Sequence, residues 1–317
     1  MLVPNSYLLR LILCGLALIG YIPSVHAITF VPGDLYSSNY FSLTIKHYTS
    51  GGNYVDSFNL PSIYGNDVKG LSFGPNGRLY AVTSKATAGF GVVALDSTGM
   101  VQETYSGTSY VTGNLSFGKI AFATNGQFFV AGGNSLTAFT PGSSSGSVVY
   151  TNNQVYDVEP LPSGNILVLS AYQIQEITTA GSVMRTITPN ISLGDARGIE
   201  YDPVTNDIFV TMLGYTGQSF RLMRLDGSSG QVEANSYFWY GDDMILTADN
   251  RLIVGSRTQP PGIFDTNLNQ IGSLNGGDQM FVTQMPYSVP EPSTLALFTV
   301  GTIGLLGWAW RRRKQTI

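Results

Sequence analysis

Residues 70–82 read GLSFGPNGRLYAV: an apolar stretch, a turn of Gly, Pro and Asn, and a second apolar stretch. Two short apolar runs joined by such a turn predict an antiparallel hairpin. The same phrase returns, with other residues, at 120–130, 158–169, 199–210 and 244–254. We take as its equivalent turn residues Gly77, Gly126, Gly164, Asn206 and Asn250. The steps between them are 49, 38, 42 and 44 residues, a period typical of four-stranded propeller blades.

The two ends of the repeat region carry complementary halves of this phrase. Residues 33–36 (GDLY) match its second half alone, and residues 278–282 (DQMFV) match its first half alone. We expect the last strand to join the first three in one blade, because closure leaves no unpaired β edge there. The sequence thus predicts an all-β, six-bladed β-propeller with terminal strand closure over residues 28–289. A β-sandwich is the alternative, but it does not require complementary half-repeats.

The composition agrees with short strands and tight turns. Charged residues make up only 11%, while Gly (37), Tyr (18) and Phe (16) are plentiful. Cys14 and His26 precede the predicted cleavage point described next, which leaves a mature chain with no cysteine and with His47 as its one histidine. We therefore expect no disulfide, cysteine nucleophile or cysteine-based metal site.

Residues 1–27 are predicted to be a secretory signal peptide. Arg10 supplies the positive charge, residues 11–22 form the apolar core, and Val25-His26-Ala27 is a small-residue cleavage site. The apolar run is short for a membrane-spanning helix. An uncleaved anchor is the alternative.

A second apolar stretch, residues 295–310, is predicted to be a single transmembrane helix. It is followed by a basic stop made of Arg311, Arg312, Arg313 and Lys314. Basic residues flanking a span stay on the cytoplasmic side, so we expect the main domain to lie outside. In front of the helix, the prolines of a short acidic motif favour an extended backbone. This motif is Val289-Pro290-Glu291-Pro292-Ser293.

These C-terminal features closely resemble the PEP-CTERM sorting signal, which we place at residues 290–317. The resemblance implies recognition by an exosortase, removal of the helix and tail, and attachment or release at the cell surface. It also implies export through the inner membrane by the general secretory route with a transient membrane anchor. Proteins with this signal are associated with exopolysaccharide and biofilm matrix, so a polysaccharide or a surface protein is the expected partner. The repeated phrase, in turn, resembles the repeats of NHL-like six-bladed propellers.

Acidic residues precede most of the predicted innermost strands. They are Asp67, Asp157, Asp195, Asp242, Asp243 and Asp278, with Lys119 in the remaining blade. Carboxylates around one mouth of the axial channel would suit Ca²⁺ or another divalent cation. The alternative is that each Asp accepts backbone N–H bonds in the turn entering its strand. Metal-binding propellers of the gluconolactonase type suggest a metal-dependent hydrolase or lactonase, but their ligand pattern does not match this sequence residue by residue.

Two local motifs are interpreted as turns. Residues 142–146 match G-x-S-x-G, but they lie in a Gly/Ser-rich hairpin loop rather than a strand–turn–helix. Residues 265–270 begin like a calcium loop but have Gln270 where Gly is required. No catalytic residues are predicted.

Charge and aromatic content favour a binding role over nucleic-acid recognition. Residues 28–290 hold 19 acidic and 11 basic side chains, which disfavours phosphate-rich partners. Aromatic residues provide surfaces for stacking on sugars, although about half are expected in blade interiors. They are Tyr36, Tyr40, Tyr215, Tyr237, Phe238, Trp239 and Tyr240. The sequence therefore predicts an exported surface or matrix protein, with the hydrolase as the alternative.

Overall fold

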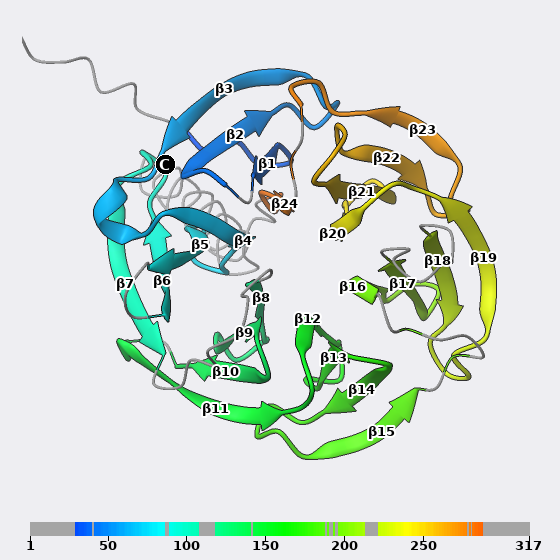
Figure 1. The fold of residues 1–317 in the computed structure, drawn as a ribbon. Coiled ribbons are helices and arrows are strands. Elements are labelled where there is room, and N and C mark those ends of the chain that lie inside the picture. Colours follow the sequence, from blue (N-terminus) through cyan, green and yellow to red (C-terminus); the bar gives the residue numbers. More distant parts are fainter. Residues whose placement is uncertain are drawn as a thin grey trace, which may run out of the picture.

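The chain forms an all-β ring around a central axis. The computed structural model describes residues 29–39, 41–85, 89–107, 118–140, 142–187, 189, 193, 196–212, 221–277, 279 and 281–287. Within these ranges the regular structure is β-strand, apart from one short 3₁₀ turn, η1 (Ser62–Tyr64). Figure 1 shows the strands stacked outward from the axis, each stack with its innermost strand facing the centre.

The described strands fall into six consecutive groups of four, each antiparallel from the axis outward. Group 1 has the order β24-β1-β2-β3, with β24 (Phe281–Gln284), β1 (Leu35–Ser38), β2 (Thr44–Tyr48) and β3 (Tyr54–Asn59). Group 2 contains β4 (Asp67–Phe73), β5 (Leu79–Lys85), β6 (Gly89–Leu95) and β7 (Val101–Gly107). Group 3 contains β8 (Lys119–Phe122), β9 (Phe128–Gly132), β10 (Ser135–Phe139) and β11 (Ser145–Thr151). Groups 2 and 3 share one eight-stranded sheet, because β7 and β11 pair in parallel.

The other three groups are separate four-stranded sheets. Group 4 contains β12 (Val155–Pro160), β13 (Ile166–Ser170), β14 (Gln173–Ile177) and β15 (Val183–Ile187). Group 5 contains β16 (Ala196–Asp202), β17 (Asp207–Met212), β18 (Arg221–Asp226) and β19 (Val232–Tyr237). Group 6 contains β20 (Gly241–Leu246), β21 (Arg251–Ser256), β22 (Gly262–Asp265) and β23 (Gln270–Ser273).

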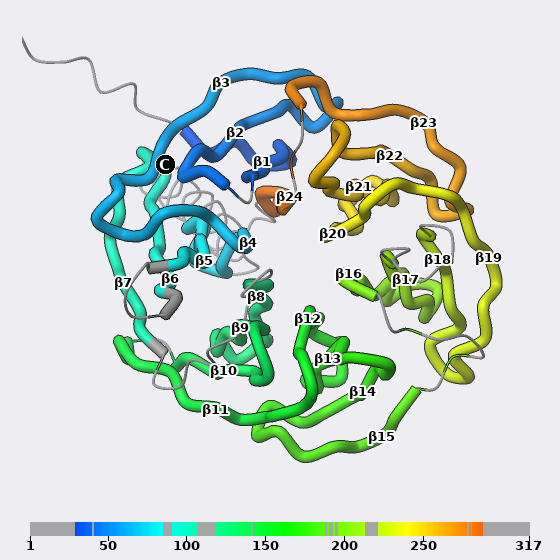
Figure 2. The backbone as a smooth tube through the Cα atoms, viewed as in Figure 1, coloured from blue at the N-terminus to red at the C-terminus, as the bar shows by residue number. Residues whose placement is uncertain are grey.

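The expected terminal closure is present in group 1. The last strand, β24, pairs antiparallel with the first, β1, in a register that sets Leu35 opposite Gln284 and Ser38 opposite Phe281. Figure 2 shows β1 in blue beside β24 in orange at this point. The pairing gives β1 a partner on its axial side that its own hairpin cannot supply.

The predicted equivalence of the turns is confirmed by their backbone. Each joins an innermost strand to the second strand of its group, and each has a positive φ. The values are 73° for Gly77, 81° for Gly126, 85° for Gly164, 64° for Asn206 and 60° for Asn250. Gly and Asn are the residues that adopt this left-handed conformation at least cost, which explains their recurrence.

The hydrophobic core lies between groups rather than within them. Each of the six clusters of buried apolar side chains joins two neighbouring groups, and the one between groups 4 and 5 also includes Phe281 of β24. One of them packs Leu35 and Tyr48 of group 1 against Ile253 and Ile263 of group 6, and so links the first part of the ring to the last. A group therefore depends on both neighbours to bury its faces.

The two faces of the ring are named here by the innermost strands. On the start face these strands begin, as β12 does at Val155, and on the end face they finish, as β24 does at Gln284. The described chain also leaves from the end face, at Met285 to Tyr287. Within the described ranges, no helix has the length and apolar character needed to cross a membrane. The predicted signal peptide and transmembrane helix lie outside those ranges.

Candidate functional site

A charged cluster at the axis is built by one repeated position of the innermost strands. In β4, β12, β16 and β20 the pairing with the second strand shifts register just before Gly70, Asp157, Gly198 and Asp243, respectively. Lys119 begins β8 and pairs with Ala131 at the corresponding place. The same local geometry thus presents different side chains, and in three groups these are charged.

Lys119 crosses the channel to meet two of these carboxylates. Its Nζ forms an ion pair with Oδ1 of Asp243 and lies 3.7 Å from Oδ2 of Asp157. The Asp157 and Asp243 side chains are excluded from solvent, and that of Lys119 is 11% exposed. A charged pair at this depth is maintained only when its remaining polar atoms are also satisfied.

The two aspartates satisfy those atoms by bonding to the neighbouring group. Oδ2 of Asp157 accepts a hydrogen bond from the backbone N–H of Ile199 at 2.7 Å, and Oδ2 of Asp243 accepts one from Val282 at 3.0 Å. Each bond joins adjacent innermost strands, β12 to β16 and β20 to β24. These side chains therefore connect neighbouring groups in the ring.

The other acidic candidates have separate partners. Asp67 accepts a hydrogen bond from Ser84 and pairs with Lys69 at 2.8 Å. Asp242 is buried and pairs with Arg257, whose Nε lies 3.0 Å from Oδ2. The predicted location before the strands is wrong for Asp157, Asp242 and Asp243, which lie inside their strands and are buried rather than lining an open mouth. Asp157 and Asp243 follow the register shift and reach Lys119, whereas Asp242 lies within the shift and pairs with Arg257.

The metal prediction stays a prediction. Asp195 and Asp278 lie outside the described residues. Within the described part of the chain, no three or more His, Cys, Asp or Glu side chains are grouped so as to hold a metal ion.

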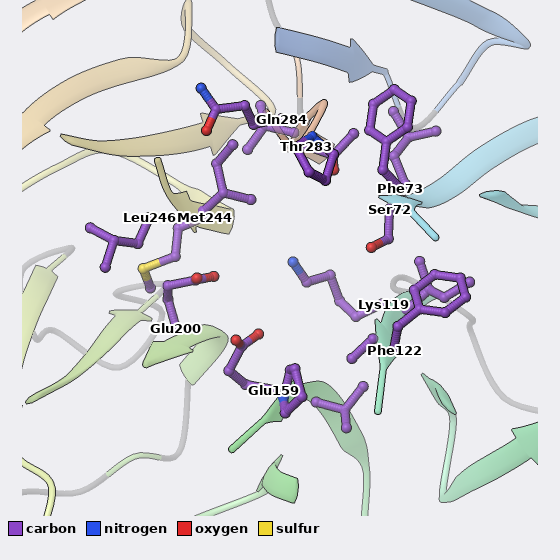
Figure 3. Close-up of a pocket in the computed structure, with 18 of the residues that line it drawn as sticks. Ser72, Phe73, Lys119, Phe122, Glu159, Glu200, Met244, Leu246, Thr283 and Gln284 are labelled. Carbon is purple, nitrogen blue, oxygen red and sulfur yellow. The ribbon is translucent and has the colours of Figure 1, made fainter. Parts of the chain in front are cut away.

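An axial cavity of about 430 Å³ lies between the charged cluster and the end face. The later parts of the innermost strands line it, together with Pro286 beyond β24. Figure 3 shows Glu159 of β12 and Glu200 of β16 directed into this space, with the amine of Lys119 on the other side of it. The cavity has the size of typical small-ligand sites.

Burial raises the pKa values of the carboxyl groups around this cavity. It raises the pKa of Asp157 to about 6, although Lys119 and the N–H of Ile199 act in the opposite direction. Burial likewise raises the pKa of Glu200 to about 8, against the field of Lys119 and a hydrogen bond from the N–H of Leu246. The pKa of Glu159 is raised well above its ordinary value by burial first and then by the charge of Glu200. Such raised pKa values are common at functional sites.

The two glutamates were not among the residues predicted from the sequence. Each lies two positions after the repeated axial position: Glu159 follows Asp157, and Glu200 follows Gly198. Since alternate residues of a strand share a face, this spacing also directs them toward the axis. Both glutamates could have been identified from the sequence by following every second residue of each innermost strand beyond its repeated axial position.

A second feature is an aromatic cluster made of Tyr237 at the end of β19 and of Trp239 and Tyr240 on the connection to β20. Tyr237 packs edge-on against Trp239 at 5.6 Å between ring centroids, and Trp239 lies 6.1 Å from Tyr240. Tyr237 is 50% exposed and Trp239 is 47% exposed. The connection precedes an innermost strand, so the cluster lies on the start face.

The remaining aromatic candidates divide between core and undescribed segments. Tyr36 and Phe238 are buried, while Tyr40 and Tyr215 lie outside the described residues. On the start face, two exposed rings were not among the residues predicted from the sequence: Phe41 in the β1–β2 turn and Tyr172 in the β13–β14 turn.

The two motifs interpreted as turns are turns. Gly142, Ser143 and Ser144 lie in the β10–β11 connection, and Ser145 and Gly146 begin β11; Ser143 Oγ donates to the carbonyl of Ser145. The β22–β23 turn is held by Asp265, which accepts the backbone N–H of Asn269 at 2.8 Å. His47 lies in group 1, with its ring nitrogens 2.9 Å from Asp34 and 3.1 Å from Asp56.

Comparison with solved structures supports the propeller fold. A protein of unknown function from Bacteroides caccae matches with a TM-score of 0.59 and 12% identity, covering 80% of this chain and 99% of that one. A chain of a nidogen/laminin complex matches with a TM-score of 0.59 and 11% identity, covering 80% and 98%. The WD40 β-propeller domain of Doa1 matches with a TM-score of 0.54 and 13% identity, covering 77% and 80%. At these identities the likeness shows the fold alone.

Sequence comparison identifies the C-terminal signal. Residues 288–314 match the PEP-CTERM protein-sorting motif. A search of curated proteins finds no match. The chain therefore carries a PEP-CTERM sorting motif behind a β-propeller domain, and the motif indicates exosortase processing, export and a surface or extracellular location.

Proposed function

We propose that this protein is an exported surface or matrix component whose six-bladed propeller, residues 28–289, binds a polysaccharide or protein partner through the aromatic cluster of the start face. The observation that most supports this proposal is that Tyr237 and Trp239 are about half exposed and pack against each other where β19 of group 5 leads into group 6. Aromatic rings held in this way present a flat apolar surface next to polar atoms, which suits sugar rings and protein side chains alike.

The position of the cluster relative to the sorting motif supports this role. The described chain ends at Tyr287 on the end face, and the sorting motif begins at residue 288. The start face is on the other side of the ring. While the C-terminal segment is anchored, the aromatic cluster is then on the face opposite the anchor, where an extracellular partner has access.

The proposed route has three steps. The signal peptide, residues 1–27, directs export by the general secretory route, and the predicted helix at 295–310 holds the chain in the inner membrane. Exosortase then acts at the segment containing Pro290, Glu291 and Pro292 and removes the helix and its basic stop.

This route is tested by changing Glu291 to Ala in a host that has an exosortase. We expect the variant to stay in the membrane fraction at full length, while the natural chain is shortened and reaches the surface or medium. Immunoblotting of cell fractions measures both. Equal processing of the two chains would contradict the sorting step.

Binding is tested with the full chain purified in detergent, on a glycan array and in pull-downs from the producing organism's own matrix. The Trp239→Ala variant should lose on the order of ten-fold or more in affinity, as is typical of aromatic hot spots. Tyr54→Ala is the matched control, because Tyr54 is 48% exposed and lies on the end face. Equal loss in both variants, or in neither, would contradict a binding surface on the start face.

The hydrolase alternative rests on a metal among the axial aspartates. Its support is weaker than that for binding, because Asp157 and Asp243 already share Lys119 and accept backbone N–H groups. Metal analysis of the purified chain measures it directly. A stoichiometric divalent ion that is lost in an Asp243→Ala or Asp195→Ala variant would favour the hydrolase.

A further inference from the structure

The axial cavity contains two carboxyl groups that have no ion-pair partner among the described residues. Glu159 and Glu200 come from neighbouring innermost strands and occupy the same position in their groups, opposite Leu167 and Phe209, respectively. The nearby amine of Lys119 is already in an ion pair with Asp243. Neither glutamate has an ion pair with any described Lys, Arg or His.

Glu159 and Glu200 differ in the hydrogen bonds that they receive. Glu200 accepts a hydrogen bond from the backbone N–H of Leu246. No hydrogen bond from a described residue reaches Glu159, although burial is the largest influence on its pKa. Its partial exposure is to the cavity that it lines, and Figure 3 shows its carboxyl group directed there. A buried carboxyl group without a partner is costly unless something else contacts it.

Apart from Lys119, whose amine is paired with Asp243, the rest of the wall is uncharged. The corresponding positions of the other groups are Ser72, Ala121, Ile245 and Thr283, all of which line the cavity. Phe122 and Met244 add further apolar surface. One side of the cavity is therefore acidic, and the remainder offers hydroxyl groups and apolar contacts.

We propose that this axial cavity binds a primary ammonium group carried on a body about the size of one sugar ring or one long side chain. Glu159 and Glu200 would accept hydrogen bonds from the ammonium, and the uncharged wall would contact the body. This site is separate from the aromatic cluster, so a test of ammonium binding does not depend on whether the proposed function is correct.

Size and ligand number favour an ammonium over a metal ion. The cavity of about 430 Å³ has room for an organic ligand rather than a bare ion. Two carboxylates fall short of the six or more oxygens that Ca²⁺ requires, whereas an ammonium has only three hydrogens to donate. An amino sugar and a lysine side chain both carry this ammonium group, and the test below distinguishes them.

Because the pKa values of the glutamates are raised, binding of an ammonium group should be accompanied by a measurable release of protons. The charged groups around the site are Glu159, Glu200, Asp157 and Asp243, with Lys119 as the cation. An incoming ammonium favours the ionised form of the glutamates, so binding at neutral pH should release protons. A neutral ligand in the same cavity would not.

The test is isothermal titration calorimetry on the full chain in detergent at pH 7, in two buffers with different ionisation enthalpies. The probes are glucosamine and Nα-acetyl-lysine amide, and the neutral controls are N-acetylglucosamine and Nα-acetyl-norleucine amide. We expect at least one amine to bind with proton release and its neutral counterpart to bind at least about ten-fold more weakly. Glucosamine binding alone would identify amino sugars, and lysine amide binding alone would identify a protein side chain.

Variants connect the binding to the cavity. The double variant Glu159→Gln, Glu200→Gln should bind the amine about ten-fold or more weakly. It should fold, because glutamine keeps the shape of the protonated glutamic acid that the raised pKa values favour in the free chain. Glu176→Gln is the control. Glu176 lies on β14, away from the axis, and pairs with Arg185 of β15, so removing its charge should leave binding unchanged. The proposal is overturned if neither amine binds, if the neutral probes bind equally well, or if the double variant binds like the natural chain.

Discussion

At the residue scale, the decisive side chains are Lys119, Asp157 and Asp243. They occupy one repeated position in three groups and meet at the axis, where Asp157 and Asp243 also bond to the next innermost strand. Each carboxylate is thus shared between a distant lysine and a neighbouring backbone. Removing one partner leaves the other buried without compensation.

We predict that Asp243→Ala lowers the free energy of unfolding by about 3–5 kcal/mol, because it leaves a buried lysine and an unpaired N–H at Val282. Urea denaturation followed by circular dichroism measures the change. The double variant Lys119→Met, Asp243→Asn should cost less than the sum of its two single changes, because it removes both charges together. Simple additivity would mean that the two charges do not interact.

The carboxyl groups at the axis also predict a pH dependence of stability. In the folded chain the pKa of Glu200 is about 8 and the pKa of Asp157 is about 6, above the ordinary pKa values of 4.5 and 3.8, so both carboxyl groups keep their protons to higher pH. The folded state then binds more protons than the unfolded state, so the free energy of unfolding should fall as pH rises from 5.5 to 8. Thermal melts across this range measure it. Glu200→Gln should flatten the slope, and a stability that rises with pH would contradict the assignment.

At the element scale, the innermost strands approach each other closely enough to restrict side-chain size. A Cβ on Gly70 of β4 would lie 1.8 Å from the carbonyl oxygen of Gly118, just before β8. The N–H of Gly118 also donates to the carbonyl of Lys69 at 2.9 Å. Backbone contacts backbone here, so neither side can move aside without breaking this bond.

Gly70→Ala should therefore destabilise the fold by about 3 kcal/mol or more, beyond the usual cost of overpacking a core. The matched control is Gly164→Ala, a turn glycine with φ of 85° and open space around its Cβ position, for which only the backbone cost of about 1 kcal/mol is expected. Thermal melts of both variants make the comparison. Equal effects would show that the contact between β4 and β8 tolerates a side chain.

At the scale of the whole molecule, stability depends on ring closure. The core clusters lie between groups, and the one that joins group 6 to group 1 includes Val282 of β24. Strand β24 also gives β1 its axial partner. The last strand thus contributes to the pairing and to the core at once.

We predict that a chain ending at residue 280, which lacks β24, is largely insoluble or unfolded, because β1 loses its partner and the cavity loses one wall. A chain ending at Tyr287 is the control and should keep the natural melting temperature within a few degrees, since it retains every described strand. Solubility on expression and circular dichroism measure both. A folded, soluble chain ending at residue 280 would show that closure is dispensable.

The sequence by itself determined the repeat, the left-handed turns, the pairing of the two chain ends and the sorting motif. These features depend on local chemistry: Gly and Asn at turn positions, alternating apolar strands, and prolines around Glu291. The tertiary structure decided which side chains meet. Asp157 and Asp243 were visible as acidic residues, but only the register shifts and the ring bring them to Lys119 across the axis. Glu159 and Glu200 lie 41 residues apart and share a cavity because equivalent positions of neighbouring strands converge on the axis.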